Sequence, residues 1–455
     1  MIYKELIDNI ENRVGKFKSK TNIRMIKILE HFDNPCDSMK FIHIAGTNGK
    51  GSTSYFLYEI LKSKFKVGLY TSPGLTSYRD RIVVGDLRIS ESEFLSIGEE
   101  ILEKEKLIIG PYGELNNFEF LTTIAFIYFK RKNCQLVVLE VGMGGRCDST
   151  NIIKAENKLI SIITSISYDH IKYLGNTIEE ISSEKAGIIC QNGIVVTSNK
   201  DKKILKVLQD ECEKKNASIY YSKDLCVKIL KSDLQGSKFI LNLEKKDYEI
   251  SLDQIGIYQI ENAILCLYSL FILIKKALID FDFTKATRLI KDAKWKGRME
   301  LVSKNPRILL DGAHNIGGIE KLRDNLKLFY FDKLYLVSSI LKDKDHKKML
   351  EEIGELADLL ILVDLESKSN EDIEILEKEA QASVKKVMSK SSLKEALNYI
   401  VPMARPDDLI LVSGSLQLIK EFYILKEMDE LSYDWKRRNY KLLKKNREEI
   451  FRKWL

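Results

Sequence analysis

A glycine-rich turn between a buried strand and a helix constrains the fold of this chain more than any other segment. Residues 41–45 (Phe-Ile-His-Ile-Ala) form a short apolar run, which is typical of a buried strand. The turn at residues 46–52 (Gly-Thr-Asn-Gly-Lys-Gly-Ser) follows, and residues 52–63 have the periodicity of a helix. Backbone N–H groups at such a helix start can surround phosphate oxygens. We therefore predict a nucleoside triphosphate site at this turn.

The lysine in this turn is the predicted source of positive charge. Lys50 would neutralise the β- and γ-phosphates, and a hydroxyl just after it could reach phosphate or metal. The spacing is one residue shorter than G-x-x-x-x-G-K-[ST], and a glycine follows the lysine. The alternative is an ordinary glycine-rich turn whose lysine is solvated and binds no ligand. It is disfavoured because strand, turn, lysine and hydroxyl would then occur in this order by chance. The predicted nucleotide-binding residues here are Thr47, Asn48, Gly49, Lys50, Gly51, Ser52 and Thr53.

Short apolar runs alternate with amphipathic segments along the rest of the chain, which predicts βαβ units and mostly parallel sheets. Further strands of a first series are expected at residues 67–70, 136–141, 159–165 and 194–197. A second series is expected at residues 307–310, 333–338, 359–363 and 409–412. Residues 223–251 alternate polar and apolar side chains, which indicates a small antiparallel hairpin set.

The predicted fold class is α/β with two domains, because 455 residues exceed one ordinary core. Residues 1–296 would form the phosphate-binding domain, with a mostly parallel sheet flanked by helices. Residues 297–428 would form a smaller, Rossmann-like α/β domain. Residues 429–455 are expected to form a basic helical tail.

Composition and charge narrow the functional classes. The chain has 44% hydrophobic and 31% charged residues, and we find no apolar run of 18 or more, so we expect no membrane span. Seven scattered cysteines without a C-x-x-C pair predict neither zinc nor disulfides and favour the cytoplasm. Residues 431–455 hold nine basic and three acidic residues, which is +6 of the total +7. The body is therefore nearly neutral, which argues against a nucleic-acid groove.

A second motif places a carboxylate at the end of a predicted strand. Residues 139–151 read Leu-Glu-Val-Gly-Met-Gly-Gly-Arg-Cys-Asp-Ser-Thr-Asn, and Glu140 could hold Mg²⁺ at the sheet edge where ligands bind. Arg146 and Asp148 are either a structural pair or substrate contacts. The residues themselves leave both interpretations open.

The remaining candidates are weaker when each is taken alone. His170 follows another predicted strand beside Asp169, and it is either a metal ligand or a structural histidine. Lys185 by itself is typical of a surface charge. The last three candidates are Asn262, for an adenine edge or a helix-start contact, Arg298, for a phosphate clamp or a linker arginine, and Asp311, for a ribose acceptor or a strand-end turn.

Together these segments resemble the Mur ligase superfamily and, within it, the folylpolyglutamate synthase/dihydrofolate synthase family. The resemblance runs from about Asn22 to Leu416, nearly the whole chain except the tail. At least seven motifs appear in order: GTNGKGS, YTSP, FEFLT, EVGMGGRCDSTN, SYDH with SEKAG, GIYQIEN and DGAHN. Their number and order make the resemblance specific.

The resemblance implies an ATP site between two domains with two Mg²⁺ ions. Ser72, Glu140 and His170 match the metal ligands, and Lys185 matches a lysine that is carbamylated in the family. Asn262, Arg298 and Asp311 match nucleotide-binding positions. His314 is expected to contact glutamate or phosphate, and with Lys50 and Lys185 it completes the predicted catalytic set. The predicted substrate contacts are Phe118, Glu119, Arg146 and Asp148.

The implied reaction is the ATP-dependent ligation of L-glutamate to a folate carboxylate, and to dihydropteroate, through an acyl phosphate. We expect only small-molecule partners and a monomer. Three departures from the family pattern concern the acceptor rather than ATP. Gly74 replaces a histidine found in many relatives, Asp80 replaces a glutamate, and residues 364–370 (DLESKSN) lack a Ser-Pro-Arg-like stretch.

Two alternative functions follow from the same residues. The chain could be another Mur-type amino-acid ligase, although only about forty residues precede Gly46, too few for a separate UDP-binding domain. It could instead be a P-loop NTPase whose basic tail binds nucleic acid. That function would give a nucleic-acid-stimulated ATPase with a steep salt dependence.

Overall fold

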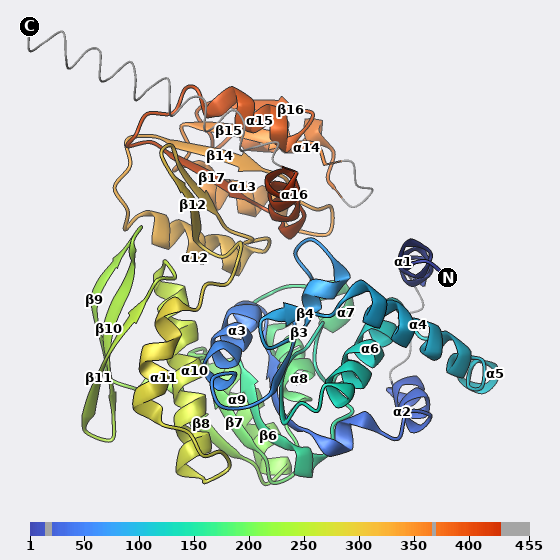
Figure 1. The fold of residues 1–455 in the computed structure, drawn as a ribbon. Helices are drawn as coiled ribbons and strands as arrows, with labels where there is room; N and C mark the ends of the chain where they lie inside the picture. The colour runs from blue at the N-terminus through green and yellow to red at the C-terminus, as the bar shows by residue number, and fades with distance from the viewer. Residues whose placement is uncertain (14–20, 366–369, 429–455) are drawn as a thin grey trace, which may run out of the picture. The chain divides into compact units, whose positions relative to one another are not determined.

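The computed structural model describes residues 1–13, 21–365 and 370–428 (Figure 1). The chain divides into two compact units. The first comprises Met1–Glu300 with Asp324–Phe329, and the second comprises Leu301–Arg323 with the chain from Tyr330 onward. Both units are mixed α/β structures with parallel-rich sheets, as the sequence predicts. The predicted helical tail lies outside the described residues.

The first unit is built on an eight-stranded sheet in the order β4-β3-β2-β5-β1-β6-β7-β8. The six strands from β2 to β8 in this order run parallel, whereas β3 and β4 are antiparallel additions at one edge. The bounds are β1 Lys40–Ala45, β2 Val67–Tyr70, β3 Ile82–Val84, β4 Leu87–Arg88, β5 Leu136–Glu140, β6 Lys158–Ile163, β7 Ile194–Thr197 and β8 Ser218–Tyr221.

Helices cover both faces of this sheet (Figure 1). The α-helices are α1 Tyr3–Glu11, α2 Ile23–Glu30, α3 Lys50–Leu61, α4 Glu91–Glu105, α5 Ile109–Tyr112, α6 Asn117–Arg131, α7 Ile171–Leu174, α8 Ile178–Ala186, α9 Lys202–Lys214, α10 Ile257–Lys275 and α11 Phe283–Leu289. Short 3₁₀ turns lie at η1 Pro35–Ser38, η2 Tyr78–Arg81, η3 Ala155–Asn157, η4 Ser222–Asp224 and η5 Ile290–Asp292.

Strand alternation separates two apolar cores. Ile42 and Ile44 of β1 point to the face covered by α3 and α10, whereas Phe41 points to the face covered by α4 and α6. Because both faces are buried, the central strands are apolar almost throughout, as expected for parallel strands. The sheet therefore holds the strand ends, and the loops that follow them, in fixed positions.

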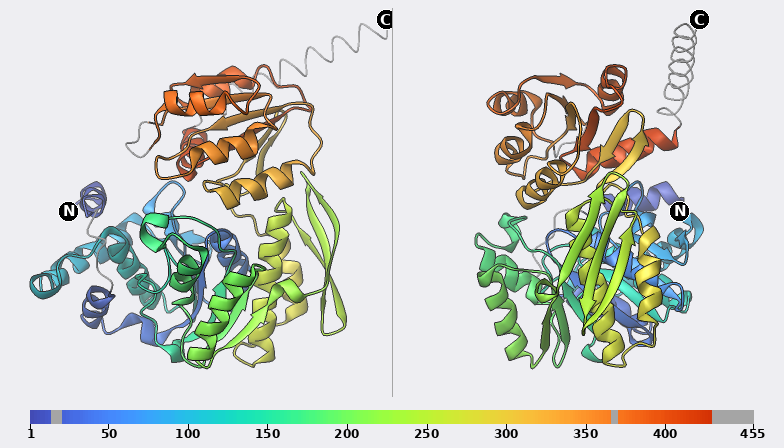
Figure 2. Two further views of the ribbon diagram at one scale, coloured as in Figure 1. Left: turned by 180° about the vertical axis from the view of Figure 1, so that it is seen from behind. Right: turned by 90° about the vertical axis from the view of Figure 1, so that its left-hand side faces the viewer.

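A three-stranded antiparallel sheet packs beside α10 and α11 (Figure 2). Its strands are β9 Val227–Asp233, β10 Gly236–Leu243 and β11 Lys246–Leu252, which confirms the hairpins predicted for residues 223–251. Phe239 and Leu241 of β10 join the core of α10. By length and composition α10 is apolar enough to cross a membrane, but 61% of that window is buried within the protein. By these two criteria α10 is an exception to the expectation that the chain has no candidate membrane span.

The second unit has a six-stranded sheet in the order β12-β13-β17-β14-β15-β16. From β13 to β16 the strands of this order run parallel. The strands are β12 Glu300–Lys304, β13 Arg307–Leu310, β14 Leu334–Ser338, β15 Leu359–Val363, β16 Val387–Lys390 and β17 Leu409–Ser413. The helices are α12 Ile316–Leu326, α13 His346–Gly354, α14 Ile373–Ala380, α15 Leu393–Ile400 and α16 Leu416–Glu427.

Candidate active site

The predicted phosphate turn lies between β1 and α3, at the carboxyl edge of the parallel sheet. Gly49 has φ +88°, a conformation that side chains rarely adopt, and a Cβ there would lie 2.3 Å from Oδ1 of Asn262. A Cβ on Gly46 would lie 1.8 Å from Oγ1 of Thr164. Glycine is therefore required at both positions by the surrounding structure.

The segment after β6 braces this turn. The amides of Thr47 and Asn48 both donate to the carbonyl of Ser165, at 2.8 and 3.2 Å. The hydroxyl of Thr47 also donates to the carbonyl of Ser167 (3.1 Å). The first intrahelical bond of α3 is from the Thr53 amide to the Gly49 carbonyl (2.9 Å). The amides just before Thr53 are therefore the ones that a helix leaves for phosphate.

Lys50 begins α3 and folds back over the turn, where its Nζ donates to the carbonyl of Thr47 (3.1 Å). Glu140 ends β5 next to this cation and is only 3% exposed. Its carboxylate accepts a hydrogen bond from the amide of Ser72 (3.3 Å). Burial raises the pKa of Glu140 to about 7, against the opposing charge of Lys50 and the Ser72 hydrogen bond. The strand ends thus bring Lys50, Ser72 and Glu140 together.

Lys185, on α8, is a buried residue and not the surface charge that its type alone suggests. It is 4% exposed, and its Nζ donates to the carbonyl of Gly46 (2.9 Å). Burial lowers the pKa of Lys185 to about 7, and the nearby Lys50 lowers it further, while Asp169 and Asp148 oppose both effects. A substantial fraction of this amine is therefore neutral at physiological pH.

His170 caps the short helix α7 with φ +50°, and its side chain is 39% exposed. Its Nε2 lies 3.9 Å from Oδ1 of Asp169, whose side chain is buried. Among the described residues, no group of three or more His, Cys, Asp and Glu side chains gathers as a metal cluster. The metal roles of Ser72, Glu140 and His170 therefore stay predictions.

Arg146 and Asp148 have separate partners rather than each other. Arg146 donates from Nη2 to the carbonyl of Ser183 (3.0 Å). Asp148 is 7% exposed and accepts from the hydroxyl of Thr150 (2.6 Å) and the amide of Met143 (3.0 Å). The carboxylate of Asp148 therefore holds the glycine turn that follows Glu140.

A residue that the sequence analysis did not single out extends this network. His43, within β1, is fully buried, and its Nε2 lies 2.9 Å from the hydroxyl of Thr150. The single hydroxyl hydrogen of Thr150 goes to Asp148, so Nε2 of His43 is the donor. Burial holds the pKa of His43 well below its usual value, so the ring is neutral. Its place on a strand gave no signal beyond an unusual polar residue in an apolar run.

Phe118 and Glu119 begin α6, but they face different surroundings. The Phe118 ring packs against Gly142, where a Cβ would lie 2.5 Å from Cζ of the ring. Glu119 is 4% exposed, and both of its oxygens pair with Arg24, at 2.9 and 3.0 Å. The Glu119 carboxylate is thus already paired within the protein, whereas Phe118 borders the turn after β5. The substrate roles of both residues stay predictions.

Two predicted nucleotide contacts belong to the first unit. The amide of Asn262, near the start of α10, lies against Gly49 and donates to Gln259 (3.0 Å). Arg298 is half-buried, its carbonyl accepts a hydrogen bond from Gln254, and its positive charge is among those that oppose the raised pKa of Glu140. The structure therefore brings Asn262 to the phosphate turn and the charge of Arg298 to Glu140.

The other two predicted contacts, Asp311 and His314, lie in the second unit after β13. Asp311 is 2% exposed and accepts the amide of Ala313 (2.9 Å). The Nδ1 of His314 donates to the carbonyl of Gly312 (2.8 Å). Both residues follow the carboxyl end of a parallel strand, where ligands bind in open α/β sheets.

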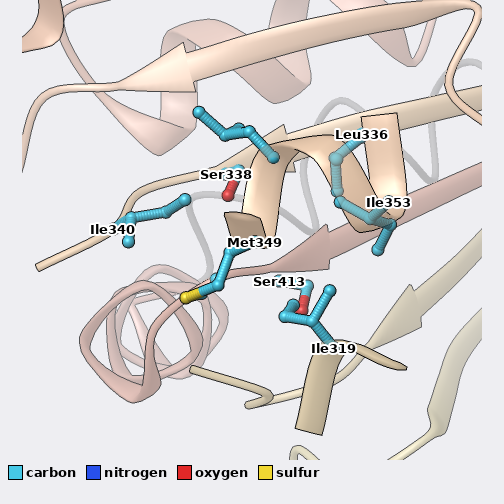
Figure 3. Close-up of a pocket in the computed structure, with 9 residues that line it drawn as sticks. Ile319, Leu336, Ser338, Ile340, Met349, Ile353 and Ser413 are labelled. Atoms are coloured by element: carbon cyan, nitrogen blue, oxygen red, sulfur yellow. The ribbon is translucent and has the colours of Figure 1, made fainter. Parts of the chain in front are cut away.

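Two hollows among the described residues are lined by side chains outside the predicted set. A cavity of about 10 Å³ in the second unit is lined by Ser338, Ser413 and apolar side chains such as Met349 (Figure 3). It holds at most about one water molecule. A hollow of about 300 Å³ beside α10 is lined by Ile257, Ile260 and other residues outside the predicted set. Neither of these two hollows is lined by the phosphate turn, Glu140 or Lys185.

Known proteins resemble this chain over both of its units. Residues 44–270 match the Mur ligase middle domain, and residues 297–416 match the Mur ligase glutamate ligase domain. The dihydrofolate synthase/folylpolyglutamate synthase of Bacillus subtilis is 33% identical over 414 residues, which cover 89% of this chain and 95% of that protein.

Solved structures are similar over nearly the full length. Folylpolyglutamate synthase from Thermotoga maritima is 32% identical with a TM-score of 0.80, covering 93% of this chain and 96% of that one. E. coli FolC, solved in complex with DHPP and ADP, is 25% identical with a TM-score of 0.82, covering 95% and 99%.

The raised pKa of Glu140 predicts a pH-dependent cost to stability. A folded-state pKa of about 7 against a usual value of 4.5 means that the folded protein holds this proton to higher pH than the unfolded chain. Stability attributable to Glu140 is therefore lost as pH rises between these values. Glu140→Gln should remove a cost on the order of 3 kcal/mol at pH 8 and less than about 1 kcal/mol at pH 5.

Urea unfolding in metal- and nucleotide-free buffer at the two pH values measures this difference. Glu100→Gln is the matched control, because Glu100 is 41% exposed and paired with Arg131 on the surface. An equal gain at both pH values in Glu140→Gln would show that this carboxyl is not the titrating group.

Proposed function

We infer the function of this chain from one premise: it belongs to the dihydrofolate synthase/folylpolyglutamate synthase family of Mur ligases. We propose that it joins L-glutamate to the carboxylate of a folate, and to dihydropteroate, at the expense of ATP. The observation that carries this proposal is the sheet edge where the phosphate turn meets a buried carboxylate, Glu140, and a buried lysine, Lys185.

The proposed reaction has two steps. An oxygen of the acceptor carboxylate attacks the γ-phosphorus of ATP, which forms an acyl phosphate and releases ADP. The amine of glutamate then attacks the acyl carbon, phosphate leaves, and an amide remains. Lys50 and Arg298 counter the negative charge on the transferring phosphoryl group, and the first-turn amides of α3 hold the phosphates.

Magnesium fits the residues at this edge. Mg²⁺ prefers oxygen ligands, and Ser72 and Glu140 already contact each other there. Burial leaves the Glu140 carboxylate in need of a compensating cation. We propose that Ser72, Glu140 and His170 hold the two Mg²⁺ ions, which neutralise phosphate charge when bound.

The surroundings of Lys185 favour its carbamylation. Its neutral Nζ would attack the carbon of CO₂, form an N–C bond and lose one proton, which leaves a carboxylate-like anion. Lys50 repels the protonated form of Lys185, whereas it would attract the carbamate anion. The same anion would face the metal ions.

We assign the remaining predicted residues by their places in the fold. Asn262, against the turn, would contact adenine, and Asp311 would accept from ribose. His314 would contact glutamate or phosphate. Phe118 and Arg146 would contact the acceptor directly. Glu119 and Asp148 are assigned to the same substrate site, where their carboxylates are already hydrogen-bonded within the protein.

We further propose a monomeric enzyme of the cytoplasm with small-molecule partners only. No disulfide joins the cysteines in the part of the chain that the structure describes, as suits a reducing compartment. Neither a nucleic acid nor a membrane is needed for the reaction.

Phosphate release with ATP and L-glutamate tests the proposed function directly. We expect glutamate-dependent release when 7,8-dihydropteroate or a reduced folate is added, with the amide product visible by mass spectrometry. The comparison of the two acceptors decides whether one or both are used. Release without amide formation, or no release with either acceptor, would contradict the proposal.

Lys50→Ala should lower turnover by a factor of roughly 100 or more, because it removes a charge that stabilises the transition state. Lys64→Ala is the matched control, since Lys64 follows α3 and its exposed side chain pairs with Asp280 on the surface. Steady-state phosphate release measures both variants. Near-normal ligation by Lys50→Ala would contradict the proposal that the phosphate turn takes part in the reaction.

Lys185→Ala should lose most of its turnover, and short carboxylates such as acetate should partly restore it by standing in for the carbamate. Wild-type protein equilibrated with ¹³C-bicarbonate should show a carbamate signal by NMR that is absent from the variant. Full activity without added carboxylate would contradict the proposed modification.

A further inference from the structure

The glycine that follows the lysine of the phosphate turn is not explained by the backbone. Gly51 is the second residue of α3, and it is absent from the described glycines with positive φ. Glycine within a helix costs about 1 kcal/mol relative to alanine. A side chain at position 51 must therefore be excluded for another reason.

The indole of Trp295 is that reason. A Cβ on Gly51 would lie 2.8 Å from Nε1 of Trp295, and 3.2 and 3.3 Å from Cε2 and Cζ2. These atoms belong to a rigid ring, which cannot yield as the end of a flexible side chain can. The ring also packs on Tyr55 of α3, with centroids 5.0 Å apart. Trp295 therefore lies against the first turns of the phosphate-binding helix.

A buried glutamine holds the segment that carries this tryptophan. Gln254 is 3% exposed, and its Oε1 accepts the amide of Trp295 (2.8 Å). Its Nε2 donates to the carbonyl of Arg298. Gly297, with φ +68°, makes the turn between them. One side chain thus fixes both ends of residues 295–298.

Arg298 lies at the far end of this turn, and its charge acts on Glu140 across the site. We propose that Trp295 is a positioning residue: its indole packs against the start of α3 and so holds the turn that bears Arg298. Position 51 is glycine because a side chain there would occupy the space of the indole. The proposal rests on the proposed function only in giving Arg298 a phosphoryl group to stabilise.

A double-mutant cycle tests this pairing through ADP binding, measured by calorimetry in Mg²⁺ buffer. Gly51→Ala should weaken ADP binding at least about tenfold, because its Cβ displaces the indole or opens the helix start. Trp295→Phe keeps a ring beside Tyr55 but removes the indole nitrogen and outer ring. The Gly51→Ala/Trp295→Phe protein should therefore recover most of the lost affinity.

The matched control is Gly98→Ala on α4, where a Cβ would lie 2.4 Å from Cδ2 of Leu6, in another core. It should lower thermal stability while leaving ADP affinity within about twofold of wild type. Such a result separates a general glycine-packing effect from one specific to the phosphate turn.

A second readout distinguishes positioning from simple packing. Trp295→Phe alone should bind ADP within about threefold of wild type but turn over about tenfold more slowly, because Arg298 is held less firmly. The recovery of ADP affinity in the double variant is measured without an acceptor substrate. If the wild-type protein bound ADP but formed no amide, the proposed function would be contradicted, whereas the pairing of Gly51 with Trp295 would not.

Three results would overturn the proposal. In the first, the fold losses of ADP affinity in Gly51→Ala and Trp295→Phe multiply in the double variant. In the second, Gly51→Ala binds ADP as tightly as wild type. In the third, both Gly51→Ala and the double variant fail to fold. If Gly51→Ala fails to fold while the double variant folds and binds ADP, the pairing is supported.

Discussion

Parallel pairing of β1 with β5 and β6 is the constraint on which the candidate site depends. The register places Ile44 beside Glu140 and Ala45 beside Ile163, so three strands end at one level of the sheet. Each strand then releases a loop at the same edge: the phosphate turn, the glycine turn held by Asp148, and the segment of Ser165 that braces the first. A shift of register would separate Lys50 from Glu140 and remove the chemistry.

Electrostatic cost is concentrated at this edge. Glu140 and Lys185 are both nearly excluded from water, and burial moves the pKa of each to about 7. Neither charge is well compensated by the protein alone. Buried groups with strongly shifted pKa values are common at functional sites, where they cost the free protein stability. Sites of this kind bind because the free protein leaves their charges incompletely satisfied.

Much of this arrangement could be predicted from the sequence because its signals are local. The apolar runs at residues 67–70, 194–197, 307–310 and 359–363 coincide with β2, β7, β13 and β15. Strand order was not predictable, because β5 inserts between β2 and β1 through non-local pairing. The same reason hid the partners of particular side chains. Glu119 pairs with Arg24, ninety-five residues away, and Trp295 meets Gly51 across a still longer separation.

In the proposed reaction a phosphoryl group passes from ATP, held at the phosphate turn, to the acceptor carboxylate. Transfer of ¹⁸O tests it most directly: an acceptor labelled in that carboxylate is converted with ATP and L-glutamate, and the released phosphate is analysed by mass spectrometry. An acyl-phosphate route predicts that each phosphate carries one ¹⁸O atom from the acceptor. Phosphate without the label, released in step with amide formation, would rule out an acyl phosphate as the intermediate.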